Sequence, residues 1–326
     1  MIDRLGRKID YLRISVTDRC NLRCIYCMPE KGVKLVERSL LLREEEILRI
    51  VSVMAELGIR KIKLTGGEPL LYCRLPELIA EIKAISGIEK VTVTTNGILL
   101  KEQMEGLAEA GTDGINVSLD TLDRECFRRI SRRDLLDKSL DGVREVLRYP
   151  GISLKINCVP LGAADQDVCA VARLARENPV HVRFIEMMPI GYGAEFPGMT
   201  EETLKNILEE RFGRLVPYQG APLGNGPCKY YEAEGFAGKI GFISAVSHKF
   251  CGECNCIRLT SQGYLKTCLQ YTAGRDLREI IRNGCTDEEL KDVIRAALNE
   301  KPDGHHFLEK AKNDDTEKLC MSQIGG

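Results

Sequence analysis

The sequence predicts an α/β fold: a partial (βα)6 barrel of the TIM type, followed by a smaller C-terminal module. Three observations support this. Short apolar segments of strand character alternate with helical patterns over the first two thirds of the 326 residues, and small polar residues follow most of these segments. After Met188 the alternation stops, and residues 190–240 become rich in Gly and Pro. We therefore expect a barrel over residues 1–190 and a second module over residues 191–326.

Strands and helices alternate along the first part. Six segments read as strands because they are short, apolar and rich in β-branched residues: 11–16, 61–64, 91–94, 115–119, 154–159 and 182–185. Helical periodicity marks residues 44–57, 75–85, 101–110, 134–147 and 167–176. This order predicts parallel βα units whose right-handed crossovers curl the sheet into a barrel. Further helices are expected near 203–211, 277–282 and 288–299, and an extended polar tail over 300–326.

The segments that follow the predicted strands are small and polar. They read Thr-Asp-Arg-Cys at 17–20, Thr-Gly-Gly-Glu-Pro at 65–69, Thr-Asn-Gly at 95–97, Ser-Leu-Asp at 118–120, Val-Pro at 159–160 and Glu-Met-Met-Pro at 186–189. In a barrel of parallel strands the active site lies at the carboxyl ends of the strands. The sequence therefore places an active site at this mouth.

Composition excludes several classes of function. The net charge is −1, so no global basic field points to nucleic acid or to a membrane surface. The N-terminus lacks the features of a secretion signal, and no apolar run is long enough to span a bilayer. We expect a cytoplasmic protein. In a reducing cytoplasm its 14 cysteines favour metal or redox sites over disulfides.

The first group of cysteines is Cys20, Cys24 and Cys27, directly after the first predicted strand. Thiolates suit iron–sulfur clusters and zinc alike. Structural zinc needs four ligands, and no nearby fourth cysteine or histidine is present. Three thiolates around a cubane leave one iron open for a small molecule. The alternatives are a zinc site that borrows a distant ligand, or three unpaired cysteines.

This spacing resembles that of the radical S-adenosylmethionine (SAM) superfamily. Tyr26 matches the aromatic position before the third cysteine, and residues 65–69 resemble the glycine-rich loop that receives the amino group of SAM. The resemblance implies that Cys20, Cys24 and Cys27 hold a [4Fe–4S] cluster that cleaves SAM.

The second group, Cys251, Cys254 and Cys268, adds a resemblance to one family within this superfamily. Together with the terminal Gly325-Gly326, it makes the chain similar to the molybdenum cofactor biosynthesis protein A family, whose members are GTP 3′,8-cyclases. The resemblance runs from Tyr11 to Gly326 and is thinnest through 190–240. It implies a second [4Fe–4S] cluster whose open iron holds the guanine.

Further ligands are implied by positions that match this family. For SAM they are Tyr26, Gly67, Ser118 and Met188. For GTP they are Arg13, Lys63, Thr94, Lys155, Cys256, Ile257 and Arg258. The terminal Gly325 and Gly326 would reach into the active site. No acid–base triad is expected, because the cofactor supplies the reactive species and the protein supplies binding, orientation and exclusion of water.

The resemblance also implies the reaction, that of a lyase. In this family a 5′-deoxyadenosyl radical removes the 3′ hydrogen of GTP, and C3′ then attacks guanine C8. The product is 3′,8-cyclo-7,8-dihydro-GTP, the first intermediate of molybdopterin biosynthesis. The expected partners are a second copy of the chain, as a homodimer, and cyclic pyranopterin monophosphate synthase, which receives the product. The electron donor stays unknown.

Two positions depart from the family pattern. Lys63 stands where the family usually has arginine, which keeps the charge but loses bidentate contact with phosphate. Cys256 replaces an arginine two residues after Cys254. It has three interpretations: a neutral substitute that weakens GTP binding, a redox-labile free thiol, or a fourth thiolate of the second cluster. We favour a spectator thiol, because a Cys-x-Cys pair is strained around one cubane.

The remaining cysteines have no ligand spacing: Cys73, Cys126, Cys158, Cys169, Cys228, Cys285 and Cys320. We interpret Cys126, Cys158 and Cys169 as small buried residues. We assign His305 and His306 to a polar tail segment, and no role to the other histidines.

Two other functions compete with this interpretation. One is a radical SAM enzyme of the peptide-maturase type with an auxiliary cluster. The other is a non-catalytic electron carrier or zinc-ribbon binding module. The matches at Arg13, Lys155 and the terminal glycines favour the cyclase over the maturase. A carrier would have no use for an open iron beside a Thr-Gly-Gly-Glu-Pro loop.

Overall fold

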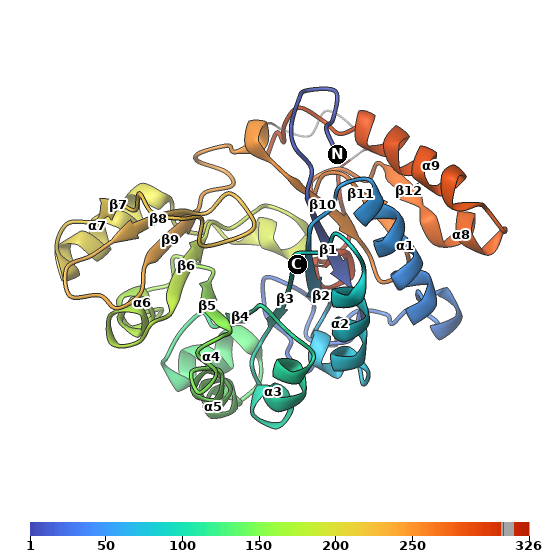
Figure 1. Ribbon diagram of the computed structural model, residues 1–326. Helices are drawn as coiled ribbons and strands as arrows, with labels where there is room; N and C mark the ends of the chain where they lie inside the picture. Colours follow the sequence, from blue (N-terminus) through green and yellow to red (C-terminus); the bar gives the residue numbers. More distant parts are fainter. Residues whose placement is uncertain (308, 310–315, 326) are drawn as a thin grey trace.

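A computed structural model describes residues 1–307, 309 and 316–325. In this part of the chain a twelve-stranded sheet runs in the order β12-β11-β10-β1-β2-β3-β4-β5-β6-β9-β8-β7. The sheet is curved, and helices α1 to α6 lie along its outer side (Figure 1). The predicted α/β fold with a parallel sheet as its core is confirmed.

The elements have the following bounds. The strands are β1 (Tyr11–Ser15), β2 (Lys61–Thr65), β3 (Lys90–Thr95), β4 (Gly114–Ser118), β5 (Ser153–Cys158), β6 (His181–Ile185), β7 (Val216–Pro217), β8 (Lys229–Glu232), β9 (Ile240–Ile243), β10 (Cys256–Leu259), β11 (Tyr264–Lys266) and β12 (Gly274–Asp276). The α-helices are α1 (Glu44–Glu56), α2 (Leu75–Ala84), α3 (Leu100–Glu109), α4 (Arg124–Ser131), α5 (Leu136–Val146), α6 (Val168–Glu177), α7 (Glu201–Phe212), α8 (Leu277–Arg282), α9 (Asp287–Asn299) and α10 (Met321–Ile324). Short 3-10 turns lie at Arg38–Leu40, Pro69–Leu71, Gly191–Glu195 and Cys251–Glu253.

The alternation of side chains along the strands separates the core from the cavity. In β1, Leu12 and Ile14 are fully buried in the main hydrophobic cluster, whereas Tyr11 and Arg13 line a cavity on the other face. Successive side chains of a strand point to opposite faces of the sheet. Apolar residues therefore hold the helices on the outer face, and polar residues collect on the inner face.

Several helices start where a side chain caps the first turn. Asp167 accepts a hydrogen bond from the Ala170 amide at the start of α6, and Thr286 with Glu289 forms a capping box at the start of α9. Between α1 and β2 the chain turns at Gly58, which has a φ of 105° that favours glycine. These local signals are the reason that most predicted helices lie within one or two residues of their observed bounds.

Residues after 190 extend both ends of the same sheet. Strand β9 pairs in parallel with β6, and β10 pairs in parallel with β1. The antiparallel strands β8 and β7 then follow β9, and β11 and β12 follow β10. Figure 1 shows these two sets of strands at opposite ends of the curve. The sequence did not predict these strands, because they have only two to four residues each.

Two other expectations were wrong. Helix α4 was not predicted because it has only eight residues, although Asp123 caps its start and Cys126, Phe127 and Ile130 form one buried side. The tail was expected to be polar and extended, but Met321–Ile324 forms the short helix α10, and Lys301, His305 and Ile324 are buried. Each of these segments is held by tertiary contacts, which local sequence does not display.

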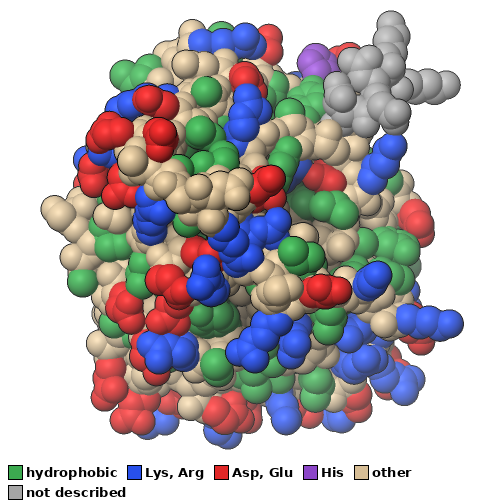
Figure 2. Space-filling view, turned by 90° about the vertical axis from the view of Figure 1, so that its right-hand side faces the viewer, with side chains coloured by type: hydrophobic (Ala, Val, Ile, Leu, Met, Phe, Trp, Pro, Cys, Tyr) green, Lys and Arg blue, Asp and Glu red, His purple; other side chains and the backbone are tan. Residues whose placement is uncertain are grey.

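Acidic and basic side chains are interspersed over the face of the molecule shown in Figure 2. This agrees with the net charge of −1. Among the described residues, no helix has the length and apolar character that crossing a membrane requires.

Candidate active site

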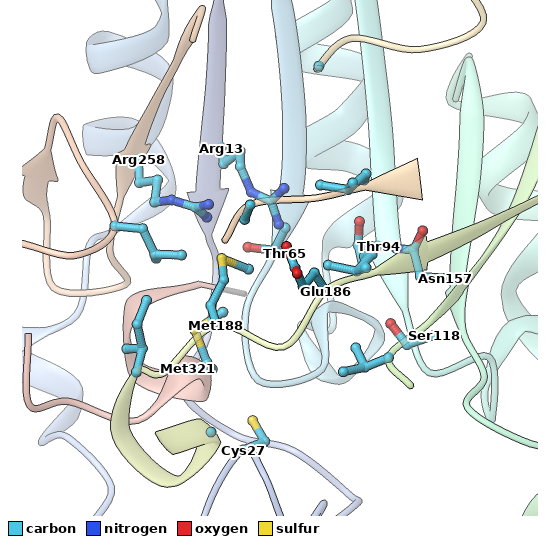
Figure 3. Close-up of a pocket in the computed structure, with 18 of the residues that line it drawn as sticks. Arg13, Cys27, Thr65, Thr94, Ser118, Asn157, Glu186, Met188, Arg258 and Met321 are labelled. Atoms are coloured by element: carbon cyan, nitrogen blue, oxygen red, sulfur yellow. The ribbon is translucent and has the colours of Figure 1, made fainter. Parts of the chain in front are cut away.

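A cavity of about 410 Å³ opens at the carboxyl ends of the parallel strands. All six cysteines of the two groups line it: Cys20, Cys24, Cys27, Cys251, Cys254 and Cys268. Residues from every predicted loop after a strand also line it, which confirms the expected mouth. In Figure 3, Arg13 and Arg258 point into one part of this space, and Cys27 lies at another, beyond Met188 and Met321.

The loop of the first cysteine group is tightly turned. The amides of Cys27 and Met28 both donate to the carbonyl of Cys24, at 2.9 and 3.1 Å. The Leu22 amide donates to Cys20 Sγ at 3.4 Å. Burial raises the pKa of Cys20 to about 11 and that of Cys27 to about 12, and raises the pKa of Cys24 well above its usual range. The thiolates therefore need a cation, which bound iron provides.

The donor set fits an iron–sulfur cluster at each group. None of the cysteines is in a disulfide, and an amide donates to one sulfur of each group: Leu22 to Cys20, and His305 to Cys251. Such N–H···S bonds are a common means of tuning cluster potential. In the described part of the chain no three His, Cys, Asp or Glu side chains are grouped to bind one metal ion. A cubane cluster does not require that grouping, because each thiolate binds a different iron.

The glycine-rich loop packs against the segment that leads to Cys20. The Gly67 amide donates to the Thr17 carbonyl at 2.7 Å, and the Glu68 amide donates to the Arg19 carbonyl at 2.7 Å. A Cβ on Gly67 would overlap the Arg19 carbonyl. Only glycine permits this close backbone approach, so the loop and the cysteine segment form one rigid wall.

Glu68 anchors that wall to the next strand. Its carboxylate accepts hydrogen bonds from the Thr95 hydroxyl at 2.6 Å and from the amides of Asn96 and Leu70 at 2.7 and 3.0 Å. Burial nevertheless raises the pKa of Glu68 to about 7. The side chain therefore holds the loops after β2 and β3 together.

The four residues predicted to bind SAM all line the cavity: Tyr26, Gly67, Ser118 and Met188. Tyr26 is fixed by its hydroxyl, which donates to Asp120 Oδ2 at 2.7 Å. Asp120 Oδ1 accepts from the Val159 amide at 2.8 Å, and burial raises the pKa of Asp120 to about 6. The structure brings these residues together around the first cysteine group.

Three of the predicted GTP ligands form a row of positive charge across neighbouring strands. Arg13 on β1 is in register with Arg258 on β10 and with Lys63 on β2, and all three line the cavity. Burial first, and then the charges of Arg183 and Arg13, lower the pKa of Lys63 well below its usual value. Burial and Arg13 likewise lower the pKa of Arg258. Buried like charges this close favour a polyanionic ligand.

Thr94 and Cys256 also line the cavity, but two predicted GTP ligands do not. Lys155 Nζ donates to the Ser153 hydroxyl at 2.8 Å, near the start of β5. Burial lowers the pKa of Lys155 to about 8. Ile257 is fully buried in the hydrophobic core, on the opposite face of β10 from Arg258.

The C-terminal tail reaches the row of cations. Arg258 Nη1 donates to the Gly325 carbonyl at 2.9 Å. Gly325 has a φ of 78°, and a Cβ there would meet Ser15 and Thr65 at 3.0 and 3.1 Å. Gly326, the other residue of the predicted tail, lies outside the described residues.

Sequence reasoning missed several residues of the cavity wall. Arg183 is 7% exposed, lines the cavity and donates to Asn157 Oδ1 and Asn116 Oδ1 at 2.9 and 2.6 Å. The signal for it was an arginine inside an apolar strand, in the same alternation as Arg13. Cys228 also lines the cavity, and nothing in its spacing indicated this.

His305 was assigned to a polar tail, and this was wrong. It is buried and lines the cavity beside Cys251. Cys126 and Cys158 are buried as predicted, whereas Cys169 is half-buried.

Comparison with known proteins gives the family. Residues 14–187 match the radical SAM superfamily, and residues 180–307 match the family described as Molybdenum Cofactor Synthesis C. Among solved structures, Streptococcus suis SuiB bound to precursor peptide SuiA has a TM-score of 0.63 at 16% identity, over 95% of this chain and 74% of that one. That likeness shows the fold alone.

Curated relatives are similar over the whole sequence. The GTP 3′,8-cyclase of Clostridium perfringens (strain 13 / Type A) is 45% identical over 328 residues, and that of Heliobacterium modesticaldum is 44% identical over 330 residues. Both alignments cover 100% of each chain. The chain therefore belongs to the GTP 3′,8-cyclase family, within the radical SAM superfamily.

Proposed function

We propose that this chain converts GTP to (8S)-3′,8-cyclo-7,8-dihydroguanosine 5′-triphosphate, the first step of molybdenum cofactor biosynthesis. The observation that carries the proposal is one cavity with three features. It holds a cysteine group and glycine-rich loop of radical SAM type, a second cysteine group, and a row of cations from three adjacent strands. A triphosphate matches that row in charge.

The cofactors are SAM and two [4Fe–4S] clusters, which supply the electron and the hydrogen-abstracting radical when bound. Cys20, Cys24 and Cys27 would hold the first cluster, and Cys251, Cys254 and Cys268 the second. Tyr26, Gly67, Ser118 and Met188 then bind SAM along the rigid wall formed by the first three loops. The chain positions SAM and GTP and excludes water, and a radical reaction depends on both.

The row of cations fixes the other end of the substrate. Arg13, Lys63 and Arg258 bind the triphosphate, while Thr94 and Cys256 complete the wall beside it. Lys155 and Ile257 act indirectly. The charge of Lys155 lowers the pKa of Lys63, and Ile257 packs in the core behind Arg258. Holding the ribose between the two cysteine groups sets which hydrogen is removed.

The remaining proposals concern organisation and context. The division at 190 and 191 is supported by the two matched ranges, 14–187 and 180–307. We also propose a cytoplasmic homodimer that passes its product to cyclic pyranopterin monophosphate synthase. Family resemblance supports these last points, and sedimentation of the reconstituted protein tests the dimer.

One anaerobic assay tests the reaction. The protein is reconstituted with iron and sulfide, and GTP, SAM and a reductant are added. The expected result is 5′-deoxyadenosine together with a cyclised GTP product. 5′-Deoxyadenosine without that product would keep the superfamily but reject the substrate, and tight binding of a peptide instead of GTP would favour a maturase. Absence of 5′-deoxyadenosine would contradict both enzymes.

A further inference from the structure

His305 is a buried imidazole that lacks hydrogen bonds. Its side chain lines the cavity, the residue is 7% exposed, and neither ring nitrogen has a hydrogen-bond partner. Burial lowers the pKa of His305 and so favours the neutral ring, and the nearby Ala245 backbone completes no hydrogen bond with it. Buried polar groups in folded proteins are nearly always paired. A ring left unpaired at a cavity wall indicates a partner that enters the cavity.

The other histidines show that His305 is exceptional in this protein. His181 accepts a hydrogen bond from the Lys239 amide, His248 lies 3.1 Å from the Ser247 hydroxyl, and His306 is paired with Glu309 at 2.7 Å. His306 is the immediate neighbour of His305, yet its side chain is exposed. The chain thus places one of two adjacent imidazoles in solvent and the other in the cavity.

The position of the ring is well fixed. The His305 amide donates to Cys251 Sγ at 3.4 Å, and the ring stacks on Phe307 with centroids 4.3 Å apart. Lys301 donates to the carbonyls of Cys256, at 3.1 Å, and Thr267. The segment that carries His305 is therefore tied to both parts of the second cysteine group.

Arg7 secures the same segment from the N-terminus. Its Nη2 donates to the Pro302 carbonyl at 2.8 Å and its Nη1 to the Cys251 carbonyl at 3.0 Å, while Asp3 pairs with its Nε at 2.6 Å. A ring held in this way keeps its direction before a ligand arrives, which reduces the entropy lost on binding.

The surroundings of His305 suit a base better than a phosphate. Phe250, Leu269 and Phe307 line the cavity together with Cys251 and Cys268, and these are apolar or sulfur-bearing side chains. The charged groups that act on the His305 ring are Lys249 and His306, not the cations of β1, β2 and β10. A phosphate only accepts hydrogen bonds, whereas a purine edge offers both donors and acceptors, as an imidazole does.

We propose that His305 recognises the purine base: its imidazole hydrogen-bonds the edge of the guanine that the cavity holds beside Cys251, Cys254 and Cys268. This inference rests on the proposed function, because it takes GTP as the substrate. It adds a side-chain contact with the base to a site in which Arg13, Lys63 and Arg258 bind the triphosphate. His305 would then set the preference for guanine over adenine.

Equilibrium binding tests the contact. GTP, ATP and inorganic tripolyphosphate are titrated against the reconstituted protein and its His305→Leu, His305→Gln and His306→Gln variants. We expect His305→Leu to weaken GTP binding roughly tenfold, the usual effect of one lost hydrogen bond. Tripolyphosphate binding should stay unchanged and the preference for GTP over ATP should shrink. His305→Gln should restore part of the affinity, and His306→Gln should match the wild type.

Iron content and the electron paramagnetic resonance spectrum of the reduced second cluster are measured on the same samples. Both should be unchanged in His305→Leu. Unchanged GTP affinity, a parallel loss of tripolyphosphate binding, or a loss of iron would each overturn the proposal. If the wild type binds no GTP, the proposed function fails as well. If the wild type binds and cyclises GTP while His305→Leu binds it equally well, only the role of His305 fails.

Discussion

Arg13 and Arg258 occupy paired positions on neighbouring parallel strands, although 245 positions separate them in the sequence. Both line the same cavity, and Figure 3 shows their guanidinium groups pointing into it. Like charges at paired positions repel each other, and burial reduces screening by water. The pair is therefore preorganised for an anion that carries several charges.

Replacing Arg258 with alanine should weaken GTP binding by roughly tenfold to a hundredfold, the range for a lost hydrogen bond to a charged group. Tripolyphosphate should lose as much affinity as GTP, and guanosine should lose none. Titration of the three ligands provides the measurement. Arg275→Ala is the matched control, because Arg275 pairs with Glu300 at an exposed position. Weaker guanosine binding would contradict a phosphate role for Arg258.

Variants of Cys256 test whether this departure from the family pattern affects GTP binding or the second cluster. Cys256→Arg should add a fourth cation to the row of Arg13, Lys63 and Arg258 and tighten GTP binding about tenfold, as one charge-assisted contact provides. Iron and sulfide per chain should not change, because Cys251, Cys254 and Cys268 suffice for the cluster. Cys256→Ala serves as the control and should bind GTP as the wild type does. A change in iron content would show that Cys256 is a ligand.

We expect Lys63 to take up a proton when GTP binds. In the free protein its pKa is lowered by burial and by Arg183 and Arg13, whereas bound phosphates stabilise the charged amine and raise the pKa. At any pH between these two values the complex holds more protons than the free protein, so GTP affinity falls as pH rises through that window.

Isothermal titration in buffers of different ionisation enthalpy measures this uptake. Lys63→Arg should abolish it, because a guanidinium stays charged throughout. The same variant should bind GTP more tightly at the upper end of the window. Equal proton uptake in the variant and the wild type would assign the proton to another group.

Gly67→Ala should disturb the SAM side of the cavity. The new Cβ would overlap the Arg19 carbonyl and displace the segment that leads to Cys20. A displacement of this kind lowers the rate of a positioned reaction on the order of a hundredfold. SAM cleavage, measured as 5′-deoxyadenosine, provides the measurement. Gly151→Ala is the matched control, since nothing lies within 4 Å of its added Cβ. Equal rates in the two variants would contradict the tight packing at Gly67.

Removing one ligand from each cysteine group should separate the two clusters. Cys27→Ala and Cys268→Ala should each reduce the iron content from about eight to about four atoms per chain, because each cluster holds four. Only Cys268→Ala should retain cleavage of SAM. Cys169→Ala should leave the iron content unchanged. Iron analysis and 5′-deoxyadenosine assays distinguish these outcomes, and loss of all iron in Cys268→Ala would argue against independent clusters.

The sequence was sufficient for the parallel barrel because its signals are local. Alternation of strand and helix segments identified β1 to β6, and the polar residues after each strand identified the mouth. The spacing of Cys20, Cys24 and Cys27 marked them as a group of metal ligands, and the resemblance to the radical SAM superfamily predicted which cluster they hold. These features depend on neighbours within a few positions, which a single sequence displays directly.

The features that the sequence did not reveal depend on contacts between residues that are far apart in the chain. Strand β10 has four residues, and its place beside β1 follows from pairing across most of the chain. His305 looked like part of a solvated tail because the residues around it are polar. Its burial comes from Cys251 and Phe307 together with the cavity wall. Arg183 was not predicted, because a single sequence does not show which face of β6 points into the cavity.

The pairing of β1 with β10 has a consequence for biosynthesis. Strand β1 leaves the ribosome long before β10, so its second partner is complete only when residue 259 has been made. Until then β1 presents an open edge of unpaired N–H and C=O groups, and β6 does the same until β9 arrives. A nascent chain with two such edges can join to other chains, so this protein should depend on chaperones during translation. The pocket for the second cluster needs Cys268, so insertion of that cluster has to follow synthesis of that residue.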